Sequence, residues 1–168
     1  MKSARALALL SHASELAALK PEAGLYRSIE GALEELVGFK LLTILRLQGS
    51  RLVRMHTSDS ATYPPGGSKD IGNDAWLRSM LSDGVAVISE DAPSVRERFV
   101  DHEAIFAIGC GSVLNIPVTS ALGTLGSLNL LHDAHWFKPE HAVLVRPFAS
   151  LLAVAWLAND SRNQRVDA

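Results

Sequence analysis

The sequence predicts a single α+β domain with a central antiparallel sheet of five to six strands. Two observations support this: strand-like segments occur in pairs joined by short turns, and helical segments lie before the first pair and after the last. Hairpins of this kind make neighbouring strands antiparallel, which argues against a doubly wound parallel sheet. The chain has 168 residues, and one domain of this length can bury a core without disulfides or metals.

Two helices are expected before the sheet. Residues 3–19 are helix-like, and Lys20-Pro21 ends this segment because proline disfavours helix at the residue before it. In the second helix, apolar residues recur at the spacing of one helical face: Leu25, Ile29, Leu33 and Leu36. Gly38 is placed to end this helix.

The first hairpin is predicted from strands at 41–47 and 51–57, which flank the turn signal at 48–50. A polar loop, 58–73, follows this hairpin. It contains two prolines followed by two glycines, which favour irregular structure.

The middle of the chain alternates short elements. Asn73 or Asp74 can cap a short helix that runs through Ser82. Residues 85–89 form a short strand, and 91–108 show partial helical spacing.

The last third predicts a second hairpin and a long helix. Strands are expected at 112–119 and 124–132, and Pro139 suits the first turn of a helix that runs to about Asn159. Residues 148–158 of that helix are apolar nearly all round, which is typical of a helix covered on two sides. We expect the sheet to cover one side and a second subunit the other.

Composition excludes several classes of function. Lys and Arg number 16 against 18 Asp and Glu, and no basic run occurs, so no nucleic-acid surface is expected. The longest strongly apolar stretch, 148–158, is shorter than the roughly 20 residues of a membrane helix, and the apolar run at 6–10 is too short for a signal peptide. A single cysteine suits a reducing compartment, so we expect a cytoplasmic protein without membrane contact.

The last hairpin carries an ordered set of motifs. Residues 108–118 read Ile-Gly-Cys-Gly-Ser-Val-Leu-Asn-Ile-Pro-Val, and residues 123–130 read Gly-Thr-Leu-Gly-Ser-Leu-Asn-Leu. Trp136-Phe137 and the long apolar helix follow. In this order the segments resemble the GAF domain, a relative of PAS domains, and the resemblance covers roughly residues 22–158.

The resemblance implies that the N- and C-terminal helices lie on one face of the sheet, while loops and short helices close a pocket on the other. It divides the chain into an N-terminal helical extension (1–20), a single GAF-like domain (21–160) and a disordered tail (161–168). GAF domains use this pocket for cyclic nucleotides, bilins, haem or other small molecules, and many dimerise through their terminal helices.

The resemblance implies a sensor of a small molecule that signals through the helices of a homodimer to a separate output protein. A ligand-free dimerisation or interaction scaffold is the alternative. A thiol-dependent enzyme of the free methionine sulfoxide reductase type is a further alternative, but those enzymes use several cysteines and this chain has one. No catalytic constellation emerges from residue spacing, so we expect a protein that is not an enzyme.

Departures from the family pattern exclude two kinds of ligand. Cyclic-nucleotide GAF domains carry Asn-Lys after the last strand and Asp-Glu after a following Phe, but this chain has His132-Asp133 and His141-Ala142 there. Bilin-binding GAF domains carry Cys-His where this chain has Val100-Asp101, so no covalent bilin is expected.

Eight residues are candidates for the pocket. Four polar residues interrupt apolar strands and need hydrogen-bond partners, which a ligand, the backbone or water would supply: Thr43, Asn115, Ser127 and Asn129. Three aromatic residues come from the covering loop and helices, where they would stack on a ligand or plug the cavity: Tyr63, Trp76 and Phe106. Cys110 lies between two glycines, and we interpret it as a packed small residue because no neighbouring cation would activate it.

Two further clusters have structural interpretations. His132, Asp133, His135 and His141 are metal-ligand types, but their spacing matches no local motif, so no metal is expected. Arg96 and Arg98 belong to a charged run that favours a solvated helix face, with an anion-binding role as the alternative.

Overall fold

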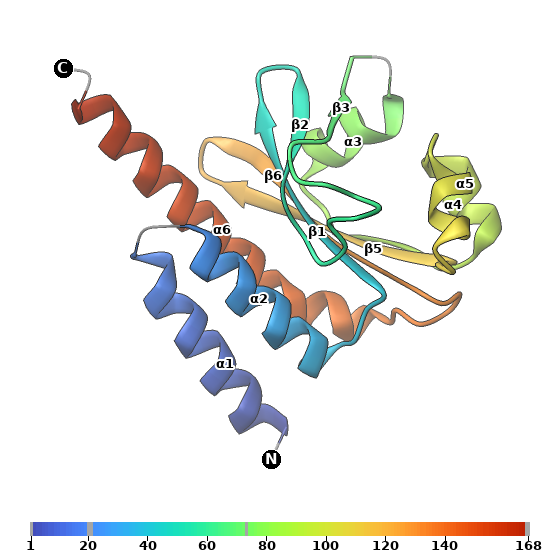
Figure 1. The fold of residues 1–168 in the computed structure, drawn as a ribbon, viewed down its shortest axis with the longest axis horizontal. Helices are drawn as coiled ribbons and strands as arrows, with labels where there is room; N and C mark the ends of the chain where they lie inside the picture. Colours follow the sequence, from blue (N-terminus) through green and yellow to red (C-terminus); the bar gives the residue numbers. More distant parts are fainter. Residues whose placement is uncertain (1, 20–21, 73, 167–168) are drawn as a thin grey trace.

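The computed structural model describes residues 2–19, 22–72 and 74–166. Within these residues the chain forms six helices and one six-stranded sheet (Figure 1). The elements are α1 (Lys2–Ala17), α2 (Glu22–Leu36), β1 (Leu41–Gln48), β2 (Arg51–Thr57), β3 (Ser68–Asp70), α3 (Ala75–Asp83), β4 (Val87–Ser89), α4 (Ala92–Arg98), α5 (His102–Ala107), β5 (Ser112–Ser120), β6 (Gly123–His132) and α6 (Pro139–Val166).

The strands run in the order β3-β2-β1-β6-β5-β4, and every neighbouring pair is antiparallel. The two predicted hairpins, β1–β2 and β5–β6, form the middle of the sheet because β1 pairs with β6. Gly126 permits this pairing, since a Cβ there would lie 2.1 Å from the carbonyl oxygen of Leu45. The predicted fold class, an α+β domain on an antiparallel sheet, is confirmed.

Helices α1, α2 and α6 lie on one side of the sheet (Figure 1). The predicted face of α2 is buried against the sheet and α6, whose side chains Phe148, Leu152 and Trp156 are also buried. The indole nitrogen of Trp156 donates a hydrogen bond to the Tyr26 hydroxyl, 2.8 Å away, so the one polar atom of this large side chain has a partner. Helix α1 packs against α2 and α6.

The opposite side of the sheet is covered by α3, α4, α5 and the loop between β2 and β3 (Figure 1). Two of these short helices, α3 and α4, begin with a side-chain cap. The Asp74 carboxylate accepts a hydrogen bond from the Leu77 amide at the start of α3, and Gly84 ends this helix with a φ of 62°. Asp91 and Ser94 form a reciprocal capping box at the start of α4.

The structure corrects three element boundaries. Residues 68–70, predicted as loop, form the edge strand β3. The segment 91–108 consists of the two helices α4 and α5. Helix α6 continues to Val166, so residues 161–166 are helical rather than part of a disordered tail. The predicted helix break at Lys20-Pro21, the alternative cap Asn73 and residues 167–168 of the tail lie outside the described residues.

By length and composition alone, α6 would qualify as a helix that crosses a membrane, although no such segment was predicted. Its buried residues instead contribute to the main core together with the sheet and α2. This packing accounts for the buried part of the apolar surface of the helix, while other apolar side chains of α6, such as Val143 and Val154, are exposed.

Candidate functional site

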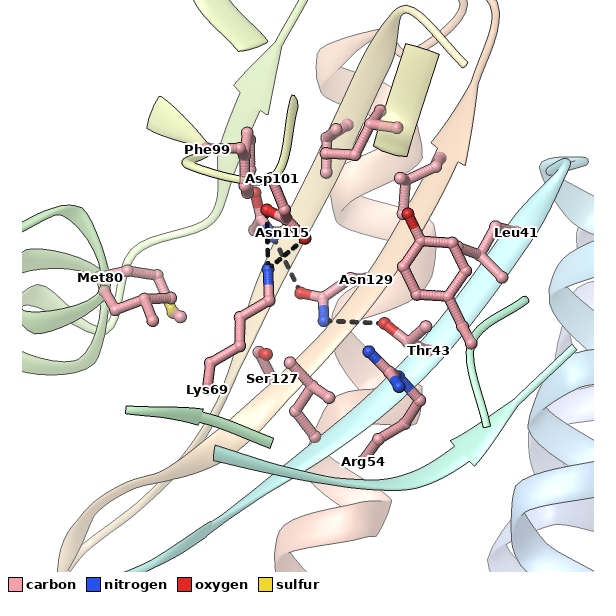
Figure 2. Close-up of a pocket in the computed structure, with 16 residues that line it drawn as sticks. Leu41, Thr43, Arg54, Lys69, Met80, Phe99, Asp101, Asn115, Ser127 and Asn129 are labelled. Atoms are coloured by element: carbon pink, nitrogen blue, oxygen red, sulfur yellow. Dashed lines mark hydrogen bonds and ion pairs between the residues drawn. The ribbon is translucent and has the colours of Figure 1, made fainter. Parts of the chain in front are cut away.

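A cavity of about 60 Å³ lies between the sheet and its cover of loops and short helices (Figure 2). This volume holds a few waters or a small molecule. The floor comes from β1, β5 and β6 through Leu41, Thr43, Leu45, Val113, Asn115, Ser127, Asn129 and Leu131. The walls and mouth come from Arg54, Tyr63, Lys69, Leu77, Met80, Phe99, Asp101 and Ile105.

A row of three polar side chains crosses the floor. Strand register places Thr43 beside Asn129 and Asn129 beside Asn115. The Asn115 amide nitrogen donates to the Asn129 amide oxygen at 2.9 Å, and the Asn129 amide nitrogen donates to the Thr43 hydroxyl at 3.2 Å (Figure 2). Ser127 lies two residues before Asn129 and therefore faces the same side of the sheet. The row is polar and buried, in a sheet whose neighbouring positions are apolar.

Four buried polar atoms of the cavity lining find no hydrogen-bond partner among the described residues: Arg54 Nε, Tyr63 Oη, Asn115 Oδ1 and Ser127 Oγ. An unpaired buried polar group costs about 1–3 kcal/mol, so native proteins leave few of them. The set combines one obligate donor, one obligate acceptor and two hydroxyls that can do either. It therefore matches a guest that carries both acceptors and donors.

Arg54 enters the cavity from β2. Its guanidinium lies 5.1 Å from the centre of the Tyr63 ring, and its Nη1 donates to the carbonyl oxygen of Pro64 at 2.9 Å. Gly67 leaves room for this arrangement, since a Cβ there would lie 2.5 Å from Nη1. Burial lowers the pKa of Arg54, opposed by the nearby Tyr63 and Asp101. An arginine still stays charged, so the cavity contains a half-buried cation.

The mouth of the cavity is bridged by an ion pair. Lys69 of β3 donates to both carboxylate oxygens of Asp101, at 3.0 and 2.9 Å (Figure 2). An outer surface groove shares Arg54, Lys69 and Asp101 with the cavity. These three side chains therefore form the boundary that the cavity shares with the groove.

Five of the eight predicted pocket residues line the cavity: Thr43, Tyr63, Asn115, Ser127 and Asn129. Trp76 instead packs edge-on against Phe99, with ring centres 6.3 Å apart. The rotation of α3 presents Leu77 and Met80 to the cavity in its place.

Phe106 and Cys110 also lie outside the lining. The Phe106 ring contacts the guanidinium of Arg96 at 5.0 Å. Cys110 is buried in the small apolar cluster under α4 and α5. Burial raises the pKa of its thiol to about 11, so the thiol stays protonated at neutral pH.

Sequence reasoning missed the charged residues of the site. Arg54 faces the cavity while His56 faces the other side, where its Nε2 lies 2.5 Å from Glu30 of α2. Arg54 and His56 are two residues apart, so in a regular strand they would share a face. The register shift between Ile44 and Leu45 is a bulge that places them on opposite faces. Such a bulge has no signal in the alternation of β2 itself.

The two clusters with structural interpretations lie outside the cavity. The His132 ring stacks on Trp136 at 3.8 Å, and His141 Nδ1 accepts a hydrogen bond from the Lys138 amide. Arg98 donates to the Ser89 hydroxyl at 2.9 Å. Arg54 of β2 lines the cavity, whereas Arg96 and Arg98 of α4 do not.

No protein-family model matches the sequence, and no curated protein matches it either. Solved structures match its fold. The GAF domain of a phosphoenolpyruvate-protein phosphotransferase from Coxiella burnetii is 15% identical, with a TM-score of 0.79 over 98% of this chain and 99% of that one. The GAF domain of a two-component sensor histidine kinase from Bacillus halodurans is 15% identical, with a TM-score of 0.74 over 86% of this chain and 99% of that one.

A third match is the free methionine-R-sulfoxide reductase from Neisseria meningitidis in complex with its substrate. It is 13% identical, with a TM-score of 0.74 over 96% of this chain and 94% of that one. Identities this low establish a shared fold and no more. Together with the observed strand order and the terminal helices on one face of the sheet, these matches show that the chain has the GAF fold.

Proposed function

We propose that this protein is a sensory or regulatory domain that binds a small molecule in the cavity described above. The observation that carries the proposal is the set of four buried polar atoms without partners, on Arg54, Tyr63, Asn115 and Ser127. A ligand that supplies their hydrogen bonds would remove an energetic cost that the free protein bears. The mixture of donors and acceptors would also orient the ligand.

The structural matches agree with this proposal. One is the GAF domain of a sensor histidine kinase, and another is a reductase seen in complex with its substrate. The same architecture therefore occurs in a sensor protein and in one that binds a substrate. We place the protein in the cytoplasm, as the sequence predicts.

The proposed output runs through the helical side of the sheet. Ser127 and Asn129 line the cavity. Leu128, which lies between them on β6, is buried in the main core together with side chains of α6. A shift of β6 on ligand binding would therefore reach α6 directly. We propose that it changes the population of two packings of the terminal helices, and that a separate partner protein reads this change.

The terminal helices also carry the surface for the proposed homodimer. Leu7 of α1 and Val143 and Val154 of α6 are 68%, 70% and 58% exposed. A groove between the two helices has apolar walls that include Leu10 and Leu151. An exposed apolar stripe of this kind favours a protein partner, and we propose that a second copy covers it.

A ligand-free scaffold is the second candidate, and one observation favours it. The cavity volume of about 60 Å³ is small beside the roughly 300–1,000 Å³ of pockets for drug-sized ligands. In this alternative the protein dimerises with a nearly filled pocket, and the unpaired atoms bind water.

The thiol-dependent enzyme is the least supported alternative. Cys110, the single cysteine of the chain, is buried and its pKa is raised to about 11. The reactive form of a cysteine is the thiolate, which this environment disfavours. A binding role therefore agrees better with this residue than a catalytic one.

Mass spectrometry of the purified protein tests the proposal. We expect a native mass of two chains plus a small molecule that is released on denaturation. The cavity-filling variant Ser127→Val should release none, whereas Thr119→Val, an exposed change on β5, should behave as the wild type. A bare dimer that no small molecule stabilises would favour the scaffold, and a bare monomer would contradict the dimer. The variant Val154→Glu should convert the dimer to monomer without loss of helical signal.

A further inference from the structure

We infer that the ligand of this cavity is a small organic acid whose carboxylate binds Arg54 and which carries a hydrogen-bond donor, such as a hydroxyl group, at its other end. This inference rests on the proposed function and names the chemical class of the ligand. It follows from the charge balance of the cavity, from the free edge of the Arg54 guanidinium and from the polarity of the floor.

The cavity lining has an excess positive charge. Lys69 and Asp101 neutralise each other through two contacts at 2.9–3.0 Å. Arg54 makes no ion pair among the described residues, and it contacts the carbonyl oxygen of Pro64 and the Tyr63 ring. A half-buried cation without a counterion is costly. One anionic group on the ligand would make the lining and its contents neutral.

The geometry of Arg54 favours a carboxylate as that group. The contact with Pro64 uses Nη1, so it leaves the edge of the guanidinium formed by Nε and Nη2. Among the described residues this edge makes no hydrogen bond, and Nε is fully buried. Two parallel N–H groups match the two oxygens of a carboxylate. The Tyr63 hydroxyl has no partner either, and burial raises its pKa, so it keeps a proton that it can donate.

The floor of the cavity favours a donor on the ligand. The Asn115 amide nitrogen is committed to Asn129, which leaves the Asn115 amide oxygen as an acceptor without a partner. An amide oxygen can only accept a hydrogen bond. Ser127, on the same floor, can either donate or accept. With the amides oriented as they are here, a ligand that presents an O–H or N–H group toward the floor would satisfy this oxygen, and the volume of about 60 Å³ limits it to a few heavy atoms.

Thermal unfolding of the full chain with matched pairs of probes tests this inference. The acids are acetate and three acids with a terminal hydroxyl group, namely glycolate, 3-hydroxypropionate and 4-hydroxybutyrate, and the neutral probe for each is its primary amide. All samples are adjusted to the same ionic strength. We expect at least one hydroxy acid to raise the Tm more than its amide and more than acetate, which lacks the hydroxyl group.

Variants of Arg54 test whether this side chain binds the carboxylate of the acid. Arg54→Gln should weaken binding of the best acid about 10- to 100-fold by calorimetric titration, since hydrogen bonds to charged groups are the strong ones. Arg54→Lys should restore only part of the loss, because it keeps the charge without the two-nitrogen edge. Arg51→Gln, an exposed arginine on the same strand, is the matched control and should bind as the wild type does. The acid–amide comparison in the wild type stays informative if an Arg54 variant fails to fold.

The outcomes separate this inference from the proposed function. If no acid exceeds its amide, or if Arg54→Gln binds the best acid unchanged, the carboxylate assignment is overturned. If an amide or a neutral co-purified molecule binds instead, the sensor function survives and the ligand class fails. If neither acids nor amides change the Tm and the protein carries no bound molecule, the proposed function fails as well.

Discussion

The two faces of the sheet use the same strands but differ in how their buried atoms are satisfied. On the helical face, Leu128 and Leu130 are fully buried among apolar neighbours. On the cavity face, Ser127 and Asn129 are almost as deeply buried, yet Ser127 has a polar atom without a partner among the described residues. One face is packed for stability and the other keeps hydrogen-bonding capacity for a guest. Equal burial therefore does not mean equal contribution to stability.

The largest difference is expected from a core deletion on the helical face. Leu128→Ala should lower the free energy of unfolding by about 2–5 kcal/mol, because it removes buried apolar atoms and leaves a cavity. Urea unfolding measures this effect. Leu122→Ala, at a side chain that is 82% exposed, is the control and should change stability by less than about 0.5 kcal/mol. A loss below about 1 kcal/mol for Leu128→Ala would contradict the assignment of the tightly packed core to this face.

A smaller effect is expected at the centre of the polar row. Asn129→Ala removes the partner of Asn115 and of Thr43 at once. It should lower the free energy of unfolding by about 1–3 kcal/mol, since a buried donor on Asn115 loses its acceptor. The exposed Asn163→Ala serves as the control in the same urea titrations. If Asn129→Ala were as stable as the wild type, the polar row would not be part of the folded framework.

The buried thiol under α4 and α5 predicts a pH dependence. Cysteine ionises near pH 8.5 in an unfolded chain, whereas burial raises the pKa of Cys110 to about 11 in the fold. The folded state holds the proton longer, so the stability due to the neutral thiol is complete below about pH 8.5 and is lost as the pH rises toward 11.

The stability difference between the wild type and Cys110→Ala measures this effect without the contribution of other groups. It should shrink by about 2–3 kcal/mol between pH 8 and pH 11. A difference that stays constant over this range would show that the thiol is not desolvated.

The smallest effect on stability is expected at Ser127. Its hydroxyl has no partner among the described residues, so Ser127→Ala removes an unpaired buried polar group and should raise the free energy of unfolding of the ligand-free protein by about 1 kcal/mol. The same change should weaken ligand binding, measured by titration of the best small acid. A loss of more than about 1.5 kcal/mol in the ligand-free protein would mean that Ser127 supports the fold rather than a guest.

The floor of the site could be predicted from sequence because single polar residues interrupt apolar strands, and the strand period of two places Ser127 and Asn129 on one face. Thr43, Asn115, Ser127 and Asn129 all line the cavity for this reason. The last hairpin and the terminal helices were equally predictable, since their apolar patterns are long and regular.

The charged mouth could not be predicted. Arg54 depends on a bulge that alternation does not reveal, and Lys69 lies on a three-residue edge strand within a polar segment. Two aromatic residues, Trp76 and Phe106, were predicted to line the cavity but do not. Trp76 and Phe106 lie on the covering helices, but position along the chain does not determine which face of a short helix points inward.

An experimental electron-density map of the purified protein tests most directly whether the cavity face is built for a small molecule. We expect ordered non-protein density in the cavity, within hydrogen-bond distance of Arg54 Nε, Asn115 Oδ1 and Ser127 Oγ. For the inferred class of ligand, two oxygens would lie beside the guanidinium of Arg54. A cavity closed by collapse of the surrounding side chains, with these atoms paired to one another or to the backbone, would contradict this expectation.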